Sequence, residues 1–224
     1  MRLPLCLAAL LALSACQPEP TPVDGSPADV APEAVEALAD AAPTPGAPAP
    51  DFTLVDTRGT EHSLADFRGR TVVLEWLNYD CPFVGKHYGS GNMPALQERF
   101  TGEDVVWLSV VSSAPGEQGH FEPAAMDART AAEGGRPTAV LLDPTGRVGR
   151  LYDAQTTPHM FVISADGTVV YNGAIDDKPT TDQADVETAQ NYVVPAIAAA
   201  AAGQLADPSR TQPYGCSVKY APGT

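Results

Sequence analysis

Basic residues are scarce in this sequence. The chain of 224 residues has 13 Lys and Arg against 28 Asp and Glu, which gives a formal net charge of −15. Proteins bind nucleic acids and anionic membrane surfaces through clustered Lys and Arg. The charge balance therefore argues against a protein that binds either of them through a basic patch. The sequence also has no internal repeat and no glycine-rich nucleotide motif, and we expect no cofactor.

Cysteine is also rare, with four in the chain. Enzymes that work through a redox thiol often carry a second cysteine three positions after the first, but Val84 stands at that place relative to Cys81. The stretch NYDCPFVGKHY therefore leaves three interpretations of Cys81 open: a buried core thiol, a lone nucleophile, or one half of a pair.

The N-terminus has a single positive charge, Arg2, followed by an apolar run that ends at Ala15. This run is shorter than the roughly 20 residues that cross a bilayer, so it predicts a secretory signal peptide over residues 1–15. Its end, LSAC, resembles the lipobox of bacterial lipoproteins. The resemblance implies that Cys16 is lipidated and anchors the protein to a membrane of the bacterial envelope, with the domain outside the cytoplasm. An ordinary signal peptide cut nearby would leave the protein without this anchor.

A proline-rich segment follows the signal. Residues 17–50 hold nine Pro and six acidic residues but no Lys, Arg or aromatic residue. Such a composition cannot bury enough apolar surface to offset the entropy of ordering the chain. We therefore interpret residues 16–46 as the lipid anchor and a disordered linker, and residues 47–224 as the folded domain with its C-terminal tail.

Apolar runs and helical patterns alternate in the folded domain. The runs predict strands that are buried on both faces of an α/β sheet, and a hairpin is expected around ADG at 165–167. We also expect an Ala-rich helix over about 182–203, kinked or split at Pro195. The segment Asp176, Asp177, Lys178 before it reads as a solvated turn. The other predicted strands are 51–56, 71–78, 105–111 and 138–143, and the other predicted helices are about 92–100 and about 120–133.

This order of elements resembles the thioredoxin fold, an α/β architecture in which helices flank a mixed central sheet. Cys81 follows a buried strand and should begin a helix, Glu75 lies six positions before it, and Pro158 directly precedes a strand. Thioredoxin-like proteins carry a buried acid and a cis-proline at the corresponding places. The opening APDFTLVDTRGTEHSLADFRGRTVVLEW resembles the alkyl hydroperoxide reductase/thiol-specific antioxidant group, the peroxiredoxin-like redoxins. A C-terminal helical extension and a cysteine-bearing tail complete the expected fold.

The resemblance implies a thiol oxidoreductase that reduces a peroxide or a disulfide and is itself reduced by an unidentified thiol reductant protein. It also implies that Asn78, Pro82 and Thr157 contact the substrate. Two positions depart from the peroxiredoxin pattern, because Leu74 and Asn78 stand where that family has Pro and Thr. The activating arginine of the family has three candidates: Arg136, Arg147 and Arg150.

Cys81 has a physical route to reactivity. A thiolate is the nucleophile, and the unpaired N–H groups of a helix N-terminus favour the charged form of the sulfur. Lys86 could add positive charge. A buried Glu75 would hold a proton near neutrality and could exchange it with a leaving thiolate, although Glu75 could instead be a strand-end acid in solvent.

Cys216, in the tail TQPYGCSVKY, is the candidate partner of Cys81. Redoxins often use a distant resolving cysteine, which implies a reversible Cys81–Cys216 disulfide. The same two cysteines could instead form a permanent structural disulfide, which would stabilise the fold by about 4–5 kcal/mol.

Two functions outside thiol chemistry also remain open. Cys81, His87 and His159 could offer one thiolate and two imidazoles to a copper ion. The protein could also be a purely structural lipoprotein, in which a disulfide serves only to stabilise the fold.

Overall fold

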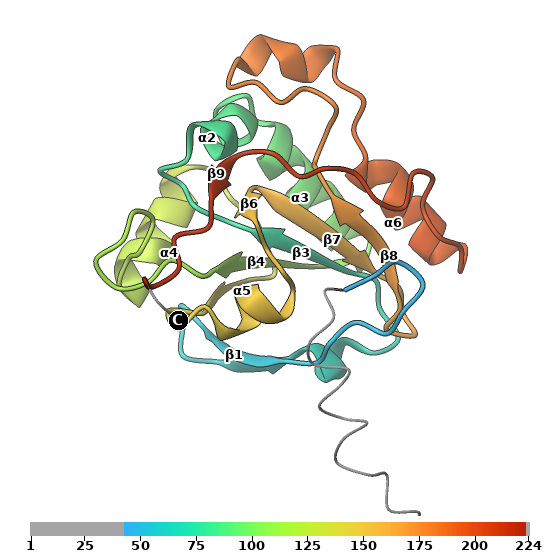
Figure 1. The fold of residues 1–224 in the computed structure, drawn as a ribbon, viewed down its shortest axis with the longest axis horizontal. Coiled ribbons are helices and arrows are strands. Elements are labelled where there is room, and N and C mark those ends of the chain that lie inside the picture. The colour runs from blue at the N-terminus through green and yellow to red at the C-terminus, as the bar shows by residue number, and fades with distance from the viewer. Residues whose placement is uncertain (1–42, 223–224) are drawn as a thin grey trace, which may run out of the picture.

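The computed structural model describes residues 43–222 (Figure 1). The predicted signal peptide and the lipidation at Cys16 lie outside the described residues. Within the described part, Pro43 already contacts the domain, since its carbonyl accepts a hydrogen bond of 3.0 Å from the side chain of Asn172. None of the helices described has the length and apolar character that a membrane crossing requires.

A seven-stranded mixed sheet forms the centre of the protein, in the strand order β2-β1-β5-β4-β3-β7-β8. The central strands β3, β4 and β5 are parallel, and the strands on either side of them are antiparallel to their neighbours. The strands predicted from the apolar runs and the hairpin are confirmed. The strands are β1 (Thr53–Asp56), β2 (Glu61–Ser63), β3 (Val72–Trp76), β4 (Val106–Val111), β5 (Ala139–Leu142), β7 (His159–Ile163) and β8 (Val169–Gly173).

Helices cover both faces of this sheet. The helices are α2 (Pro82–Gly89), α3 (Asn92–Gly102), α4 (Pro123–Ala132), α5 (Arg147–Leu151) and α6 (Val193–Ala201), with 3-10 turns η1 (Leu64–Phe67) and η2 (Gln183–Glu187). Side chains of α2, α3, α4 and α6 pack in one apolar cluster, and α5 packs in the other together with β1 and η1. The mixed sheet between two helical layers confirms the predicted thioredoxin-like fold.

Strand β3 shows how the sequence builds both layers. All five residues of VVLEW are buried, as expected for a central strand with helices on each side. Successive side chains point to opposite faces, so Val73 joins the cluster of α2 and α3 while Trp76 packs edge-on against Phe161 in the other. Glu75 shares the face of Val73, which places a carboxylate under α2.

The Ala-rich segment is split, but before Val193 and not at Pro195 as predicted. It forms the short turn η2 and the separate helix α6, which begins at Val193. Pro195 lies in the first turn of α6, where backbone N–H groups have no acceptor within the helix, so proline breaks no hydrogen bond there. The interruption has a tertiary cause: Gln190 N donates to the Asp177 carboxylate at 2.8 Å, and Asn191 bridges to Asp176, so this stretch pairs with the chain after β8.

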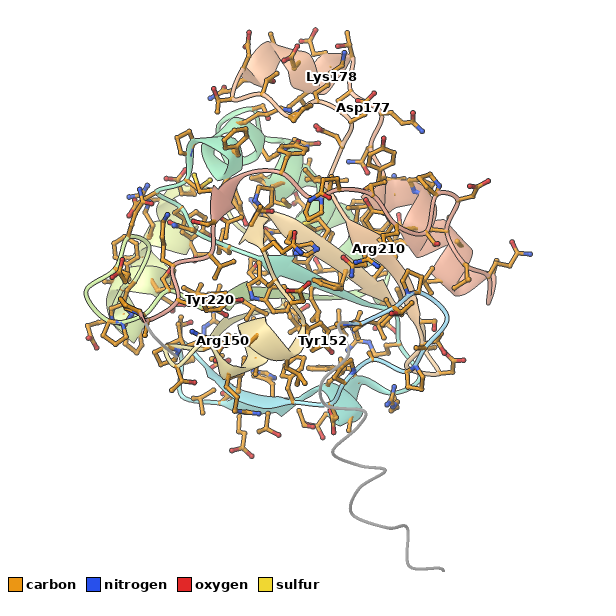
Figure 2. All side chains as sticks on the ribbon, in the orientation of Figure 1. Arg150, Tyr152, Asp177, Lys178, Arg210 and Tyr220 are labelled. Carbon is orange, nitrogen blue, oxygen red and sulfur yellow. The ribbon has the colours of Figure 1, made fainter. Side chains whose placement is uncertain are left out.

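The C-terminal tail returns across the molecule and forms a second, two-stranded sheet. Its strand β9 (Cys216–Ser217) pairs antiparallel with β6 (Thr156–Thr157), next to β7 (Figure 1). Further along, the Tyr220 hydroxyl donates to the Ala154 carbonyl at 2.8 Å. The Arg150 guanidinium lies 4.4 Å from the centre of the Tyr220 ring (Figure 2). The tail is therefore packed against the domain on both sides of its cysteine.

Candidate functional site

Cys81 lies where β3 gives way to α2. It is the N-cap residue of the helix, and Pro82 occupies the first helical position, where proline is favoured. The backbone N–H of Cys81 donates to the Asn78 carbonyl at 3.0 Å, which closes the turn between strand and helix. The side chain is only 1% exposed. A thiol is thus fixed at a helix N-terminus, as predicted, in a site that is closed to solvent.

Cys216 approaches this thiol from the tail. The β6–β9 register places Cys216 opposite Thr157. In this position its side chain packs against the apolar cluster that contains Cys81, and the two thiols are close enough to shift each other's pKa. Both cysteines are free thiols, Cys81 buried and Cys216 partly exposed. The structure therefore brings the two predicted partners together in their reduced form.

Thr157 and Pro158 form the third side of the site. The peptide bond between them is cis, which confirms the prediction for Pro158. The Thr157 carbonyl oxygen lies 3.0 Å from Sγ of Cys81, so the protonated thiol can donate to it. The Thr157 hydroxyl is buried and has no hydrogen-bond partner among the described residues in this reduced form. Thr157 is also among the residues whose side chains lower the pKa of Cys81, as a donor to the charged sulfur.

The two thiols have pKa values displaced in opposite directions. Burial by itself raises the pKa of Cys81, but hydrogen bonds from the Cys216 thiol and the Val84 N–H outweigh it, so the pKa falls below its usual value. Burial, together with the hydrogen bond to Cys81 and the adjacent charge on it, raises the pKa of Cys216 to about 11. Of the two thiols, Cys81 is therefore the one whose charged form is favoured, and Cys216 is the one that keeps its proton.

Glu75 is completely buried, as predicted, and four side chains donate to its carboxylate. Burial raises its pKa, and these four hydrogen bonds offset only part of that effect. None of the hydrogen bonds found for this carboxylate within residues 43–222 goes to Cys81. The donors are Tyr88 at 3.0 Å, Gln97 at 3.0 Å, Trp107 at 2.9 Å and Ser109 at 2.9 Å.

Asn78 belongs to the loop that leads from β3 to Cys81, and its side chain is buried. Its side-chain oxygen accepts from the Asp80 N–H at 2.9 Å, and its amide donates to the Gln118 carbonyl at 3.4 Å. Both contacts shape the loop, and a role of Asn78 toward substrate stays a prediction. The same holds for Pro82, which is exposed at the start of α2.

The three candidate arginines have partners away from this loop. Arg136 pairs with Glu98 at 3.5 Å, Arg147 donates to the Thr53 carbonyl, and Arg150 lies over Tyr220. A different arginine, Arg129 of α4, reaches the loop. It lies 3.5 Å from the Asp80 carboxylate and donates to the Tyr79 carbonyl at 3.4 Å. No spacing in the sequence signals this contact, because it depends on how α4 packs.

Lys86 pairs with Asp176 and does not take up the predicted position beside the Cys81 thiol. Its amine lies 3.3 Å from the Asp176 carboxylate, and the two side chains are 0% and 2% exposed. The expectation that Asp176 belongs to a solvated turn is therefore wrong, because the return of the chain after β8 packs it onto α2.

The residues proposed for a copper site are engaged elsewhere. Nε2 of His159 lies 2.8 Å from the Asn172 oxygen, and Nε2 of His87 lies 3.2 Å from the Tyr214 hydroxyl. Among residues 43–222, no three His, Cys, Asp or Glu side chains are grouped so that they could hold a metal ion.

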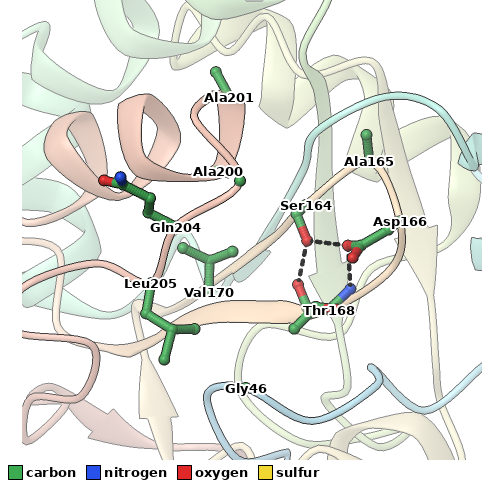
Figure 3. A pocket seen from close by; sticks show the side chains of 11 residues that line it. Gly46, Ser164, Ala165, Asp166, Thr168, Val170, Ala200, Ala201, Gln204 and Leu205 are labelled. Carbon is green, nitrogen blue, oxygen red and sulfur yellow. Dashed lines mark hydrogen bonds between the residues drawn. The ribbon is translucent and has the colours of Figure 1, made fainter.

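A cavity of about 540 Å³ lies apart from the thiols. It is bounded by the end of α6 and by the turn between β7 and β8 (Figure 3). Val170, Ala200 and Leu205 give it an apolar lining. Neither cysteine contributes to this cavity.

Comparison with known proteins agrees with this architecture. No curated protein matches the chain. An uncharacterized conserved protein from Geobacillus kaustophilus superimposes with a TM-score of 0.65 at 24% identity, covering 81% of this chain and 94% of that one. A hypothetical protein from Sinorhizobium meliloti 1021 gives 0.63 at 23% identity, covering 82% and 98%.

A third solved structure is the thioredoxin domain of a thiol-disulfide oxidoreductase from Bacteroides vulgatus, with a TM-score of 0.48 at 18% identity over 65% and 96% of the two chains. The Redoxin family matches residues 44–190, which include β3, Cys81 and Pro158. This match covers more than half of the chain, so the chain belongs to the Redoxin family, and its fold is thioredoxin-like.

Proposed function

We propose that the protein is an envelope-anchored thiol oxidoreductase in which Cys81 is the nucleophile and Cys216 the resolving thiol. The observation that carries the proposal is the contact between the two thiols, one of which has its pKa lowered while the other has it raised. A disulfide that only stabilises the fold would need neither a lowered pKa at Cys81 nor a raised pKa at Cys216. The pair supplies two electrons per cycle to the substrate.

With a peroxide, the Cys81 thiolate attacks one peroxide oxygen, a sulfur–oxygen bond forms and the oxygen–oxygen bond breaks. The leaving alkoxide or hydroxide is protonated, and Cys81 becomes a sulfenic acid. Cys216 then attacks the same sulfur, the disulfide forms, and the sulfenic oxygen leaves as water. Because Cys81 is 1% exposed, a small peroxide suits this site better than a large substrate.

With a disulfide substrate, Cys81 attacks one substrate sulfur and the other leaves as a thiolate. Cys216 then attacks Cys81 and releases the bound half of the substrate. The substrate is reduced to two thiols and the protein is oxidised to the disulfide. In this case the tail that covers Cys81 must move to admit the substrate.

Reduction of the disulfide should begin at Cys216, which is the partly exposed sulfur. An incoming thiolate of the reductant protein attacks Cys216, and Cys81 leaves as a thiolate. A thiol with a low pKa is the better leaving group. The lowered pKa of Cys81 therefore favours attack at Cys216 with Cys81 as the leaving thiolate. A second thiol of the reductant then releases Cys216.

Turnover of hydrogen peroxide and of glutathione disulfide by the full-length protein tests this function. In Cys216→Ser, a peroxide substrate should leave a sulfenic acid at Cys81 that dimedone traps, and a disulfide substrate should leave a mixed disulfide there. Ala95→Ser is the control, since it introduces the same hydroxyl at an exposed position of α3 outside the site. Full turnover by Cys81→Ser in both assays would exclude the proposal.

A redox titration separates the working pair from a structural disulfide. Structural disulfides have potentials below about −300 mV, whereas working ones are reduced more easily. We expect the Cys81–Cys216 couple above that limit. A value well below it would assign the bond to stability alone.

Membrane anchoring through Cys16 is the second part of the proposal. It is supported by the LSAC sequence at the end of the apolar run. Intact-mass analysis of membrane-extracted protein should show a mature N-terminus at a lipid-modified Cys16. Any other N-terminus, or Cys16 without lipid, would contradict it.

A further inference from the structure

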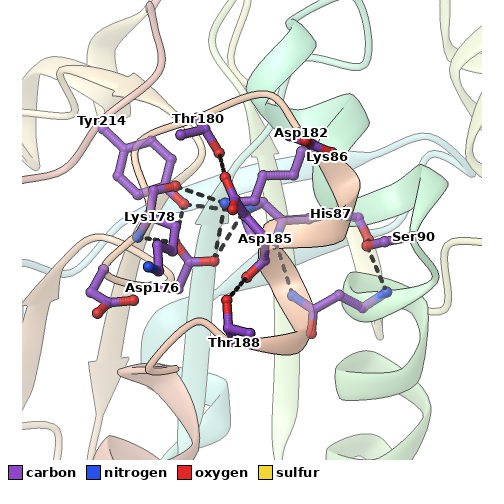
Figure 4. A network of polar contacts seen from close by, with 12 residues as sticks. Lys86, His87, Ser90, Asp176, Lys178, Thr180, Asp182, Asp185, Thr188 and Tyr214 are labelled. Atoms are coloured by element: carbon purple, nitrogen blue, oxygen red, sulfur yellow. Dashed lines mark hydrogen bonds and ion pairs between the residues drawn. The ribbon is translucent and has the colours of Figure 1, made fainter.

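A buried polar cluster lies on the side of α2 that faces the tail (Figure 4). Lys86 and His87 of α2 both approach Asp176, which follows β8. The Lys86 amine lies 3.3 Å from the Asp176 carboxylate and donates to the Lys178 carbonyl at 2.7 Å. A charged pair at this depth is stable only when its members are fully hydrogen-bonded, so each partner is needed.

Tyr214 is the member of the cluster that belongs to the tail. Its hydroxyl donates to the second oxygen of the Asp176 carboxylate and lies 3.2 Å from Nε2 of His87. Its ring lies 5.6 Å from the Lys86 amine and packs edge-on against Phe83 at 5.9 Å. The tail is thereby attached to α2 through one side chain.

The hydrogen bonds of His87 run in one direction. Asn92 offers its amide to Nδ1 of His87 at 2.9 Å, so Nδ1 accepts and the proton of a neutral ring is on Nε2. Nε2–H then donates to the Tyr214 oxygen, and Tyr214 donates to Asp176. Tyr214 has both its donor and its acceptor used, as a buried phenol requires.

The attachment point lies close to the reactive pair along both segments. Tyr214 precedes Cys216 by two residues, and Lys86 follows Cys81 by five on the same helix. The effective concentration of one thiol at another depends on how tightly the connecting chain is held. If the tail were loosely held, Cys216 could move out of its pairing with Thr157.

We propose that Tyr214, held by Asp176 and by the Lys86–His87 pair of α2, is the positioning residue that keeps Cys216 at Cys81. The inference rests on the proposed function, because it assigns to this cluster control over the disulfide equilibrium of the same two thiols. Phe83 and Lys86 contact the ring of Tyr214, and the hydrogen bonds of its hydroxyl fix the orientation of the side chain.

Tyr214→Phe tests the proposal, because it removes the hydroxyl and keeps the ring. In glutathione redox buffers, the equilibrium constant for forming the Cys81–Cys216 disulfide should fall about tenfold, which corresponds to about 30 mV. Asp176→Asn should lower it at least as much. Tyr152→Phe is the control, since it removes a buried hydroxyl that donates to the Pro50 carbonyl at 2.6 Å, away from the tail. Its equilibrium constant should equal that of the wild type.

Amide hydrogen exchange gives a readout that does not require the disulfide. The Val218 N–H donates to the Gln155 carbonyl at 3.1 Å only while the tail is in place. In reduced Tyr214→Phe it should exchange about tenfold faster than in wild type, with the amides of β3 unchanged.

Unchanged Val218 exchange, or faster exchange with an unchanged disulfide equilibrium, would overturn the proposal. If wild-type protein forms no disulfide but Tyr214→Phe still releases the Val218 amide, the proposed thiol couple is wrong and the attachment of the tail by Tyr214 stands.

Discussion

Cys216 lies directly opposite Thr157 in the two-residue ladder between β6 and β9. Thr157 in turn places its carbonyl oxygen 3.0 Å from Sγ of Cys81. Two hydrogen-bonded strands thus bring the second thiol to the first, although Val84 replaces the neighbouring cysteine that many redox thiols have. The tail is part of the site, and its backbone conformation is as important as its cysteine.

The ladder depends on Gly215, which lies directly before Cys216. Its φ is +142°, and a side-chain carbon at this position would overlap the Thr157 carbonyl. Gly215→Ala should therefore push β9 away from β6. We expect the equilibrium constant for the Cys81–Cys216 disulfide to fall at least tenfold in glutathione buffers, with a loss of about 1–3 kcal/mol in the free energy of unfolding from strain.

Gly116→Ala is the matched control for that experiment. Gly116 also has a positive φ, +85°, but no atom lies within 4 Å of the added carbon. This variant should show a comparable backbone penalty and an unchanged disulfide equilibrium. Equal redox behaviour of the two variants would mean that the β6–β9 register does not set the couple.

Thr157→Val should make Cys81 less acidic. The Thr157 hydroxyl is buried without a hydrogen-bond partner in the reduced protein and can donate to Sγ of Cys81 once the sulfur is charged, so its loss should raise the pKa of Cys81. Thiolate absorbance near 240 nm, followed against pH, measures the change. Thr156→Val serves as control, because the Thr156 hydroxyl donates to the Pro158 carbonyl at 3.1 Å instead. Coincident titration curves for all three proteins would remove Thr157 from the site.

Glu75→Gln should change both stability and redox behaviour. The substitution disturbs four hydrogen bonds in a fully buried place and should cost about 1–3 kcal/mol. Burial raises the folded-state pKa of Glu75, so the protonated carboxyl stabilises the fold below the unfolded value of about 4.3. That contribution is lost as pH rises through the folded-state pKa, and Gln abolishes this dependence.

Denaturant unfolding and disulfide reduction, both measured across pH, check the Glu75 prediction. Glu98→Gln is the control, since Glu98 is an exposed acid of α3. If Glu75→Gln leaves the pH profile of disulfide reduction as it is in wild type, Glu75 supports the core without tuning the thiols.

The buried histidines should make the protein sensitive to mild acid. Burial lowers the pKa of His87 to about 4 and that of His159 to about 4, whereas an unfolded histidine titrates near 6.5. The unfolded chain therefore binds more protons between these limits, and stability is present above pH 6.5 and lost as pH falls toward 4. Each histidine should contribute a slope of about 1.4 kcal/mol per pH unit.

Unfolding free energies at pH 7, 6 and 5 measure this slope, with Glu75→Gln as the background, because Glu75 contributes a pH dependence of the opposite sign. His159→Gln should reduce it by roughly half, because one of two buried histidines is gone. His120→Gln, at a partly exposed position, should leave it unchanged. A stability of the Glu75→Gln protein that is flat from pH 7 to 5 would contradict the prediction.

Local pattern in the sequence was enough to predict the frame of the site. The uninterrupted apolar run before Cys81 predicts a strand buried on both faces, and the following Pro82 suits a helix start. The same run makes Glu75 a buried acid, since each residue of a central strand is covered. The cis-proline at 158 was predicted by the resemblance to the thioredoxin fold and is confirmed.

Other features were decided by tertiary structure. The register of Cys216 against Thr157 joins segments far apart in the chain, and no spacing encodes it. Asp176 has the sequence neighbours of a solvated turn, yet it is 3% exposed because the chain after β8 packs on α2. Arg129 reaches the loop before Cys81 only because α4 packs beside it.

By itself, then, the sequence determined the central strands, the helices α3 and α4 and the place of the first thiol, because apolar periodicity, proline and helix capping act over a few residues. The tertiary structure decided which thiol meets Cys81 and what holds it there. Those contacts depend on strand pairing and on the burial of opposite charges, and both arise only when distant segments pack together.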